Sequence, residues 1–167
     1  MSDSTSAARL VTAQPDDTAT PDMALRERHA TRARKALDRA AATCRYAGIA
    51  EHDAKSVPRD PAEKAANALR LAAQVLAALP ESPLDPAADA RCARNAAAAA
   101  AVAAQVARDE EETSDLSAAA YRAALVASQV AMEAAGREGL GRSEGLNAKA
   151  DEAEERATLA AQAAGWI

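Results

Sequence analysis

The sequence contains two histidines and two cysteines, side chains that bind metals and act in catalysis, but their spacing does not fit a site on a helix. They are His29, Cys44, His52 and Cys92. A metal site on helices uses ligands three or four residues apart, as in the HExxH and ExxH motifs, and no pair of these four has that spacing. We expect no bound metal and no cofactor, with Cys44 as a small core residue and both histidines exposed.

Serine nucleophiles and nucleotide-binding loops also have recognisable motifs, and neither kind occurs in the required context. The sequence has no GxSxG element, which would place a serine on a sharp turn between a strand and a helix. Gly136, Gly139 and Gly141 lie close together, but no strand pattern precedes them, as phosphate binding would require. We therefore predict that the chain is not an enzyme and has no catalytic residue.

Basic side chains are concentrated between Arg26 and Arg45, and this segment is the strongest candidate for binding. A guanidinium group can hold a carboxylate with two parallel hydrogen bonds, which an ammonium group cannot do. We predict that the segment contacts an acidic surface of a protein partner. The predicted partner-binding residues are Arg28, Arg32, Arg34 and Arg39, with Lys35 in an assisting role.

Two alternatives use the same basic face. Nucleic acid is the second choice, because arginines neutralise phosphates; the chain is acidic overall, however, with a net charge of -5, and has few aromatic residues for stacking on bases. In the other alternative, the basic face packs beside acidic segments of the same chain. These segments are residues 109–112 and 151–155.

Every segment of the chain that could be regular has the periodicity of a helix. Apolar residues recur three and four positions apart, and no alternating pattern indicates a strand. Asp-Pro pairs mark two helix starts, Thr20-Pro21 marks another, and Gly48, Pro80 and Gly136 mark helix ends. The expected helices cover residues 20–48, 60–79, 85–108, 114–136 and about 143–164.

The boundary between the third and fourth expected helices is open to two interpretations. The acidic run 109–112 and the capping residues Thr113 and Ser114 favour a break. However, no glycine or proline occurs between Ala87 and Ala135, so a single long rod is the alternative.

Alanine dominates the sequence, and phenylalanine is absent. Alanine is the best helix former and fills little volume, so helices that meet through it can approach closely. We predict an all-α, up-and-down bundle of four to five Ala-rich helices, with residues 1–20 as a disordered, flexible tail and 21–167 as a single domain. The second, third and fourth helices are expected to be central.

Composition also bears on the cellular setting and the kind of function. We see no signal peptide and no long uncharged apolar run, so we expect a cytoplasmic protein without membrane contact. The abundance of alanine and arginine indicates a GC-rich bacterium. Because bulky core residues are scarce, we predict an oligomer or a hetero-complex: a non-enzymatic protein-interaction or assembly module, such as an adaptor, an inhibitor or immunity-type protein, or a self-assembling scaffold.

Overall fold

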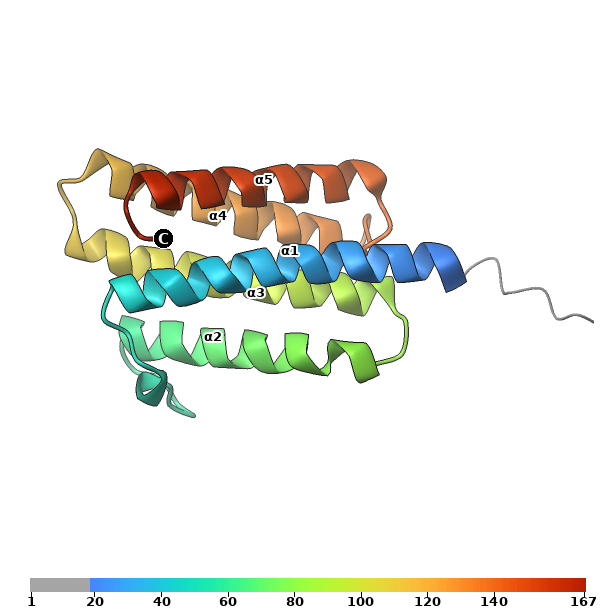
Figure 1. Cartoon of the computed structure of the whole chain (residues 1–167), viewed down its shortest axis with the longest axis horizontal. Coiled ribbons are helices and arrows are strands. Elements are labelled where there is room, and N and C mark those ends of the chain that lie inside the picture. Colours follow the sequence, from blue (N-terminus) through green and yellow to red (C-terminus); the bar gives the residue numbers. More distant parts are fainter. Residues whose placement is uncertain (1–18) are drawn as a thin grey trace, which may run out of the picture.

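The computed structural model of this chain describes residues 19–167 and contains five long helices (Figure 1). No strand occurs in this range, so the prediction of an all-α bundle is confirmed. Two short 3-10 turns, η1 (Glu51–Asp53) and η2 (Leu79–Glu81), flank the second helix. The helices are α1 (Ala19–Tyr46), α2 (Pro61–Ala78), α3 (Pro86–Glu110), α4 (Asp115–Ala135) and α5 (Glu144–Ala163).

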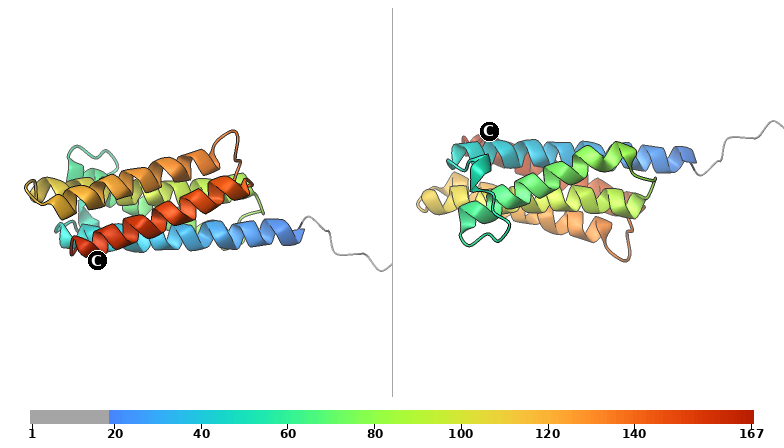
Figure 2. Two further views of the ribbon diagram at one scale, coloured as in Figure 1. Left: turned by 90° about the horizontal axis from the view of Figure 1, so that it is seen from above. Right: turned by 90° about the horizontal axis from the view of Figure 1, so that it is seen from below.

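Four of the helices form a ring, and α2 lies outside it. Contacts run from α1 to α3, from α3 to α4, from α4 to α5 and from α5 back to α1, while α2 packs on α3 and more lightly on α1. Consecutive helices run in opposite directions (Figures 1 and 2), so the up-and-down topology is confirmed. In both views of Figure 2, α4 and α1 lie at opposite edges of the bundle.

The expectation that α2 is central is wrong. Only Ala65, Ala66 and Ala72 of this helix are buried, and Leu71 and Val75 are 47% and 43% exposed. Its nearly continuous apolar character had indicated burial on all sides. Instead α3, which consists largely of alanine, has the central position, because small side chains allow neighbouring helices on three sides.

The predicted starts of α2, α3 and α5 are confirmed by capping hydrogen bonds, whereas Thr20, the predicted cap of the first helix, lies inside α1, which begins at Ala19. The Asp60 carboxylate accepts from the Glu63 backbone N–H at 2.8 Å, and the Asp85 carboxylate accepts from that of Ala87 at 3.1 Å. Ser143 caps α5 through the Leu146 N–H at 3.3 Å. Each cap satisfies an amide that the first helical turn leaves without a partner.

The structure resolves the boundary between α3 and α4 in favour of a break. Ser114 caps α4 by accepting a hydrogen bond from the Ser117 N–H at 3.2 Å. The Glu111 carboxylate lies in the turn, where it accepts hydrogen bonds from the Tyr46 and Ser117 hydroxyls. These bonds lower the pKa of Glu111, with Tyr46 as the larger cause. Capping and these contacts therefore end the helix without glycine or proline.

The centre of the bundle is built mainly from alanine methyl groups. Ala33, Ala36 and Ala40 of α1 are fully buried in one cluster with Ala93 and Ala96 of α3. The α1–α3 contact is the most extensive between any two helices, as expected when short side chains let helix axes approach.

The predicted tail and the C-terminal residues are the last two parts of the chain to place. The predicted tail at residues 1–20 falls almost entirely outside the described residues; its last two residues belong to α1. At the other end, Trp166 is buried against alanines of α3, α4 and α5.

Candidate functional site

The predicted arginine face lies largely against α5 rather than toward solvent. Arg39 donates hydrogen bonds from Nε and Nη2 to the two carboxylate oxygens of Glu154, at 3.0 and 2.9 Å. Both side chains are buried. A bidentate pair of this kind is strong because both charges are also hydrogen-bonded.

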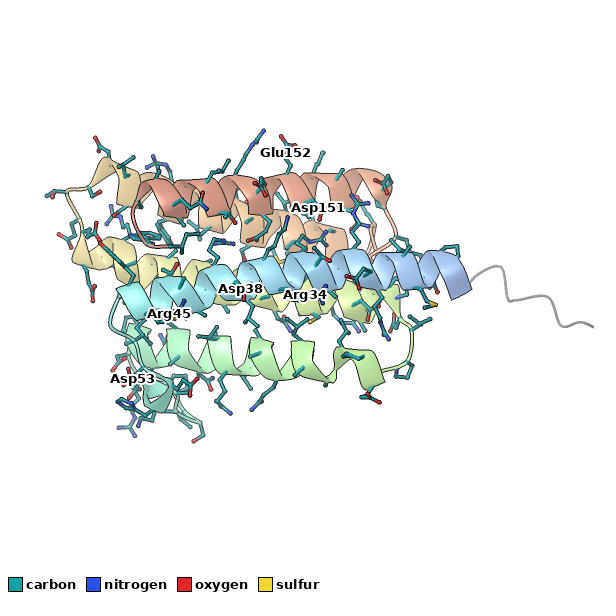
Figure 3. The ribbon with its side chains drawn as sticks, in the orientation of Figure 1. Arg34, Asp38, Arg45, Asp53, Asp151 and Glu152 are labelled. Carbon is teal, nitrogen blue, oxygen red and sulfur yellow. The ribbon has the colours of Figure 1, made fainter. Side chains whose placement is uncertain are left out.

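Arg32 lies about two turns before Arg39 on α1, and it too is bound to other residues of the chain. Its Nη1 donates to Asp151 at 2.7 Å, and its Nη2 donates to His29 Nδ1 at 3.0 Å. The side chains of Arg32 and Arg39 are only 3% exposed. Figure 3 shows Asp151 on the side of α5 that faces α1.

The other two predicted residues are more accessible. Arg28 bridges Asp151 and Glu144 of α5, at 2.7 and 2.8 Å. Arg34 is about half exposed and bonds to Glu27 of its own helix at 2.9 Å. Three of the predicted residues of α1, Arg28, Arg32 and Arg39, therefore contact carboxylates of α5. Arg34 instead lies on the outer side of α1 (Figure 3).

The expectation that His29 is exposed is wrong, whereas that for His52 is confirmed. His29 is fully buried, and burial is the main cause that lowers its pKa. An arginine can only donate and a carbonyl can only accept. His29 must therefore be neutral with its proton on Nε2, which donates to the Gly141 carbonyl at 2.8 Å while Nδ1 accepts from Arg32.

Gly141, in the loop before α5, contacts residues of α1, α3 and α5. Its carbonyl also accepts a hydrogen bond from the buried Asn147 side chain at 3.1 Å. Its φ is +74°, and a Cβ atom there would lie 2.1 Å from the Pro86 carbonyl oxygen. Only glycine fits, because any side chain would meet both a steric clash and a strained backbone.

The contact between α1 and α5, which we call the polar seam, has a signal in the sequence beside the alanine stripe. His29, Arg32, Arg39 and Thr43 are all buried, and their spacing continues a second stripe through Ala36. On α5, Asn147, Asp151 and Glu154 have the same spacing of three and four residues. Two polar stripes of opposite charge and equal period are typical of helices that pair with each other.

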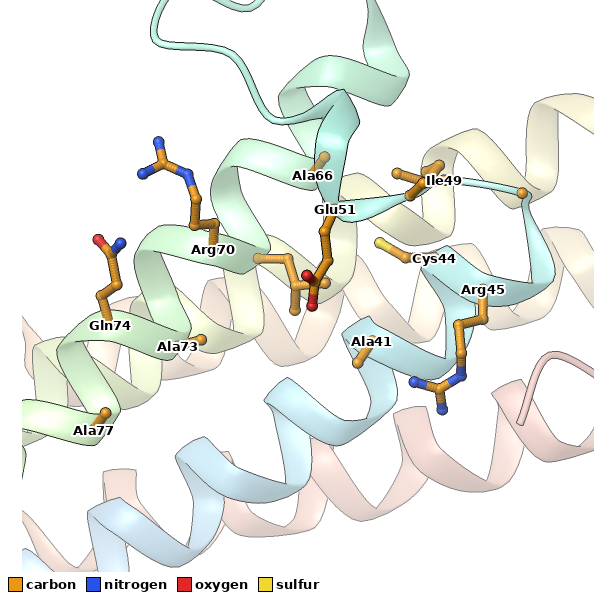
Figure 4. A pocket seen from close by; sticks show the side chains of 13 residues that line it. Ala41, Cys44, Arg45, Ile49, Glu51, Ala66, Arg70, Ala73, Gln74 and Ala77 are labelled. Atoms are coloured by element: carbon orange, nitrogen blue, oxygen red, sulfur yellow. The ribbon is translucent and has the colours of Figure 1, made fainter.

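A groove of about 960 Å³ opens between the C-terminal half of α1, η1 and α2 (Figure 4). It exists because α1 and α2 contact each other only lightly. Arg45, Glu51, Arg70 and Gln74 are the polar members of its lining (Figure 4). Its other lining residues are Ala41, Cys44, Gly48, Ile49, Ala50, Ala66, Leu69, Ala73 and Ala77.

Candidate metal ligands from residue 19 onward do not gather at the groove or at the polar seam. The described residues contain no group of three or more His, Cys, Asp or Glu side chains placed to hold a metal. Cys44 and Cys92 are free and buried, and burial raises the pKa of the Cys44 thiol to about 11. That thiol is therefore a poor nucleophile.

Comparison of the chain with family models, with curated proteins and with solved structures gave no match. Among the described helices, none has the length and apolar character that crossing a membrane requires.

Proposed function

We propose that this chain is a non-enzymatic interaction module that binds an amphipathic helix of a partner protein in the groove between α1, η1 and α2. The groove itself is the observation that supports this function (Figure 4). Along α2 it extends from Ala66 to Ala77, which corresponds to three turns, or about 16 Å of helix. An amphipathic helix fills such a groove with apolar side chains at positions i, i+3 or i+4, and i+7.

The rims of the groove indicate the charge of the partner. Arg45 and Arg70 lie on opposite sides of it, with Glu51 between them (Figure 4). Arg70 bonds only to the neutral Asn67 side chain, at 2.7 Å. Within residues 19–167, neither arginine has an ion-pair partner. We therefore expect acidic residues on both flanks of the partner's apolar stripe.

In this proposal, Arg45 and Arg70 contact the acidic partner, in place of the four arginines predicted from the sequence. Partner contact by Arg28, Arg32, Arg34 and Arg39 stays a prediction, but a partner of Arg32 or Arg39 would have to displace α5. Nucleic-acid binding was predicted for the same face, and no observation in the structure favours it over the groove.

A peptide-binding experiment tests the proposal. The probe is a set of helical peptides with a three-turn apolar stripe and acidic flanks, titrated into the labelled protein. Chemical-shift changes should be confined to residues 41–51 and 66–77. Ala73→Arg should place a charged side chain in the groove and weaken binding at least about tenfold, which corresponds to ~1.4 kcal/mol.

Charge variants test the role of the rims. Arg45→Glu and Arg70→Glu should each weaken binding of the acidic peptides. Arg59→Glu, an exposed residue outside the groove lining, is the control with the same change in net charge. The proposal is wrong if no peptide of the set binds, or if Ala73→Arg leaves binding unchanged.

A further inference from the structure

The outer side of α4 combines large apolar side chains with two charged ones. Leu125, Val126 and Met132 are 44%, 51% and 55% exposed. Buried positions such as Ala124, Ala127 and Ala131 hold the opposite side of the helix against the bundle. We call the exposed set the α4 outer face: Arg122, Leu125, Val126, Gln129, Met132 and Glu133.

The α4 outer face has the spacing of a helix-pairing seam. Residues 122, 125, 129 and 132 follow one another at intervals of three and four, as do residues 122, 126, 129 and 133. At 3.6 residues per turn, all six side chains fall within about one third of the helix circumference. Since α4 lies at an edge of the bundle in both views of Figure 2, a second helix can lie along this face.

The two charged residues give the face a direction. Arg122 and Glu133 are separated by three turns, about 16 Å along the helix, with the apolar residues and Gln129 between them. Neither has an ion-pair partner in the part of the chain that the structure describes. One end of the face is therefore positive and the other negative.

We propose that the α4 outer face binds the same face of a second copy of this chain, with the two α4 helices antiparallel about a two-fold axis. This arrangement places Arg122 of each copy opposite Glu133 of the other, and Val126 of each opposite Gln129 of the other. An interface formed by one patch on both copies must be self-complementary, and a face with opposite charges at its two ends meets that requirement only when the helices are antiparallel.

The size of the face sets the strength of this association. A single helix face buries an area at the low end for specific protein complexes. We therefore expect a dimer that forms and dissociates with concentration in the micromolar range or above. This interface is separate from the groove between α1, η1 and α2, so either one can fail without the other.

Sedimentation equilibrium over micromolar to near-millimolar protein concentrations is the primary test. The natural chain should show a monomer–dimer equilibrium. Arg122→Glu and Glu133→Arg should each raise the dimer dissociation constant by about tenfold, because each substitution replaces two attractive contacts with two repulsive ones. The double variant Arg122→Glu/Glu133→Arg restores both pairs with their charges exchanged and should return the constant close to its original value.

Two further variants complete the experiment. Val126→Lys should abolish the dimer, since it places a charge in the middle of the face, whereas Arg59→Glu, on the connection before α2, should leave it intact. Circular dichroism checks that each variant keeps its helices. The proposal is overturned by a natural chain that is monomeric at every concentration, by a dimer that the single charge variants leave unchanged, or by a double variant that is no better than the singles.

Discussion

The two sides of α1 are held by different physical means. Toward α3, α1 presents Ala33, Ala36 and Ala40, which meet other alanine methyl groups. Toward α5, it presents Arg32 and Arg39, which meet carboxylates. The first side gains apolar burial and close approach, and the second gains hydrogen bonds with a fixed geometry.

The two contacts of α1 therefore have different roles: one holds helices close together, and the other fixes their alignment along the axis. An alanine side slipped by one turn still finds an alanine opposite, because the methyl groups repeat along α3. A slip of the α5 side would leave Arg39 without Glu154, and an unpaired buried charge is strongly unfavourable. The polar seam thus determines how α1 and α5 align. The buried alanines between α1 and α3, which we call the alanine seam, determine how closely these two helices approach.

Removing one partner of the buried pair should have the largest effect. Arg39→Met leaves the Glu154 carboxylate buried without its cation and should lower the free energy of unfolding by about 3–5 kcal/mol, measured by urea denaturation. Arg34→Met, at an exposed pair, should lower it by less than about 1 kcal/mol. The double variant Arg39→Met/Glu154→Leu should recover most of the loss, and a single variant no worse than Arg34→Met would contradict this account of the seam.

A methyl group at Gly141 should have the next largest effect. Gly141→Ala forces a Cβ atom against the Pro86 carbonyl and should lower the free energy of unfolding by about 2–4 kcal/mol. Gly48 is the matched control, because its φ is +72° but no atom lies within 4 Å of an added Cβ. Gly48→Ala should show only the backbone strain, about 1 kcal/mol. Equal losses in thermal or urea unfolding would show that the close approach at Gly141 has no energetic weight.

A larger side chain in the alanine seam should lower the stability of the fold by less than the Gly141 variant does. Ala96 is buried between α1 and α3, and Ala96→Leu should lower the free energy of unfolding by about 1–3 kcal/mol through overpacking. Ala98 lies on the exposed side of the same helix, so Ala98→Leu should change it by less than about 0.5 kcal/mol. A stabilised Ala96→Leu variant would mean that the seam has unfilled space.

The smallest effect should be a loss of stability in mild acid that depends on His29. Burial is the main cause that lowers the pKa of His29 from 6.5 in the folded chain, and Arg32 lowers it further. The hydrogen bond to the Gly141 backbone opposes this shift, as do Asp89 and Asp151 more weakly. The unfolded chain therefore takes up this proton first, and stability falls as the pH decreases below about 6.5. His29→Gln should flatten this part of the pH profile in urea denaturation.

His52 is the internal control for that experiment. It is exposed on η1, so His52→Gln removes a histidine without disturbing the buried hydrogen bonds of His29. Nitrogen NMR of the imidazole should also show the proton of His29 on Nε2. A profile that changes equally for both histidine variants would contradict a specific role for the buried one.

The helix boundaries could be predicted from the sequence because capping is local. Asp60, Asp85, Ser114 and Ser143 each satisfy an amide two or three residues away, so the signal and its cause lie in one short segment. Gly48 likewise has the left-handed conformation predicted for a helix end, with φ +72°.

The position of α2 and the burial of the arginines could not be predicted in the same way. Leu71 and Val75 are exposed because α3, with its alanines, contacts the rest of the bundle more closely, and that competition between helices has no local signal. Arg32 and Arg39 are buried because carboxylates more than one hundred residues later in the sequence neutralise them. The matching three–four spacing on α5 was visible, but nothing in the sequence stated that α1 and α5 are neighbours.

The pairing of the first helix with the last has a consequence for synthesis of the chain. Arg39 and Glu154 are 115 residues apart, so α1 leaves the ribosome long before its charged partner exists. Until α5 emerges, the arginines of α1 are hydrated, and the nascent chain can form the α1–α3 alanine contact without closing the ring. We therefore expect docking of α5 to be the last step of folding, and a chain interrupted before residue 144 to keep a basic, water-exposed side on α1.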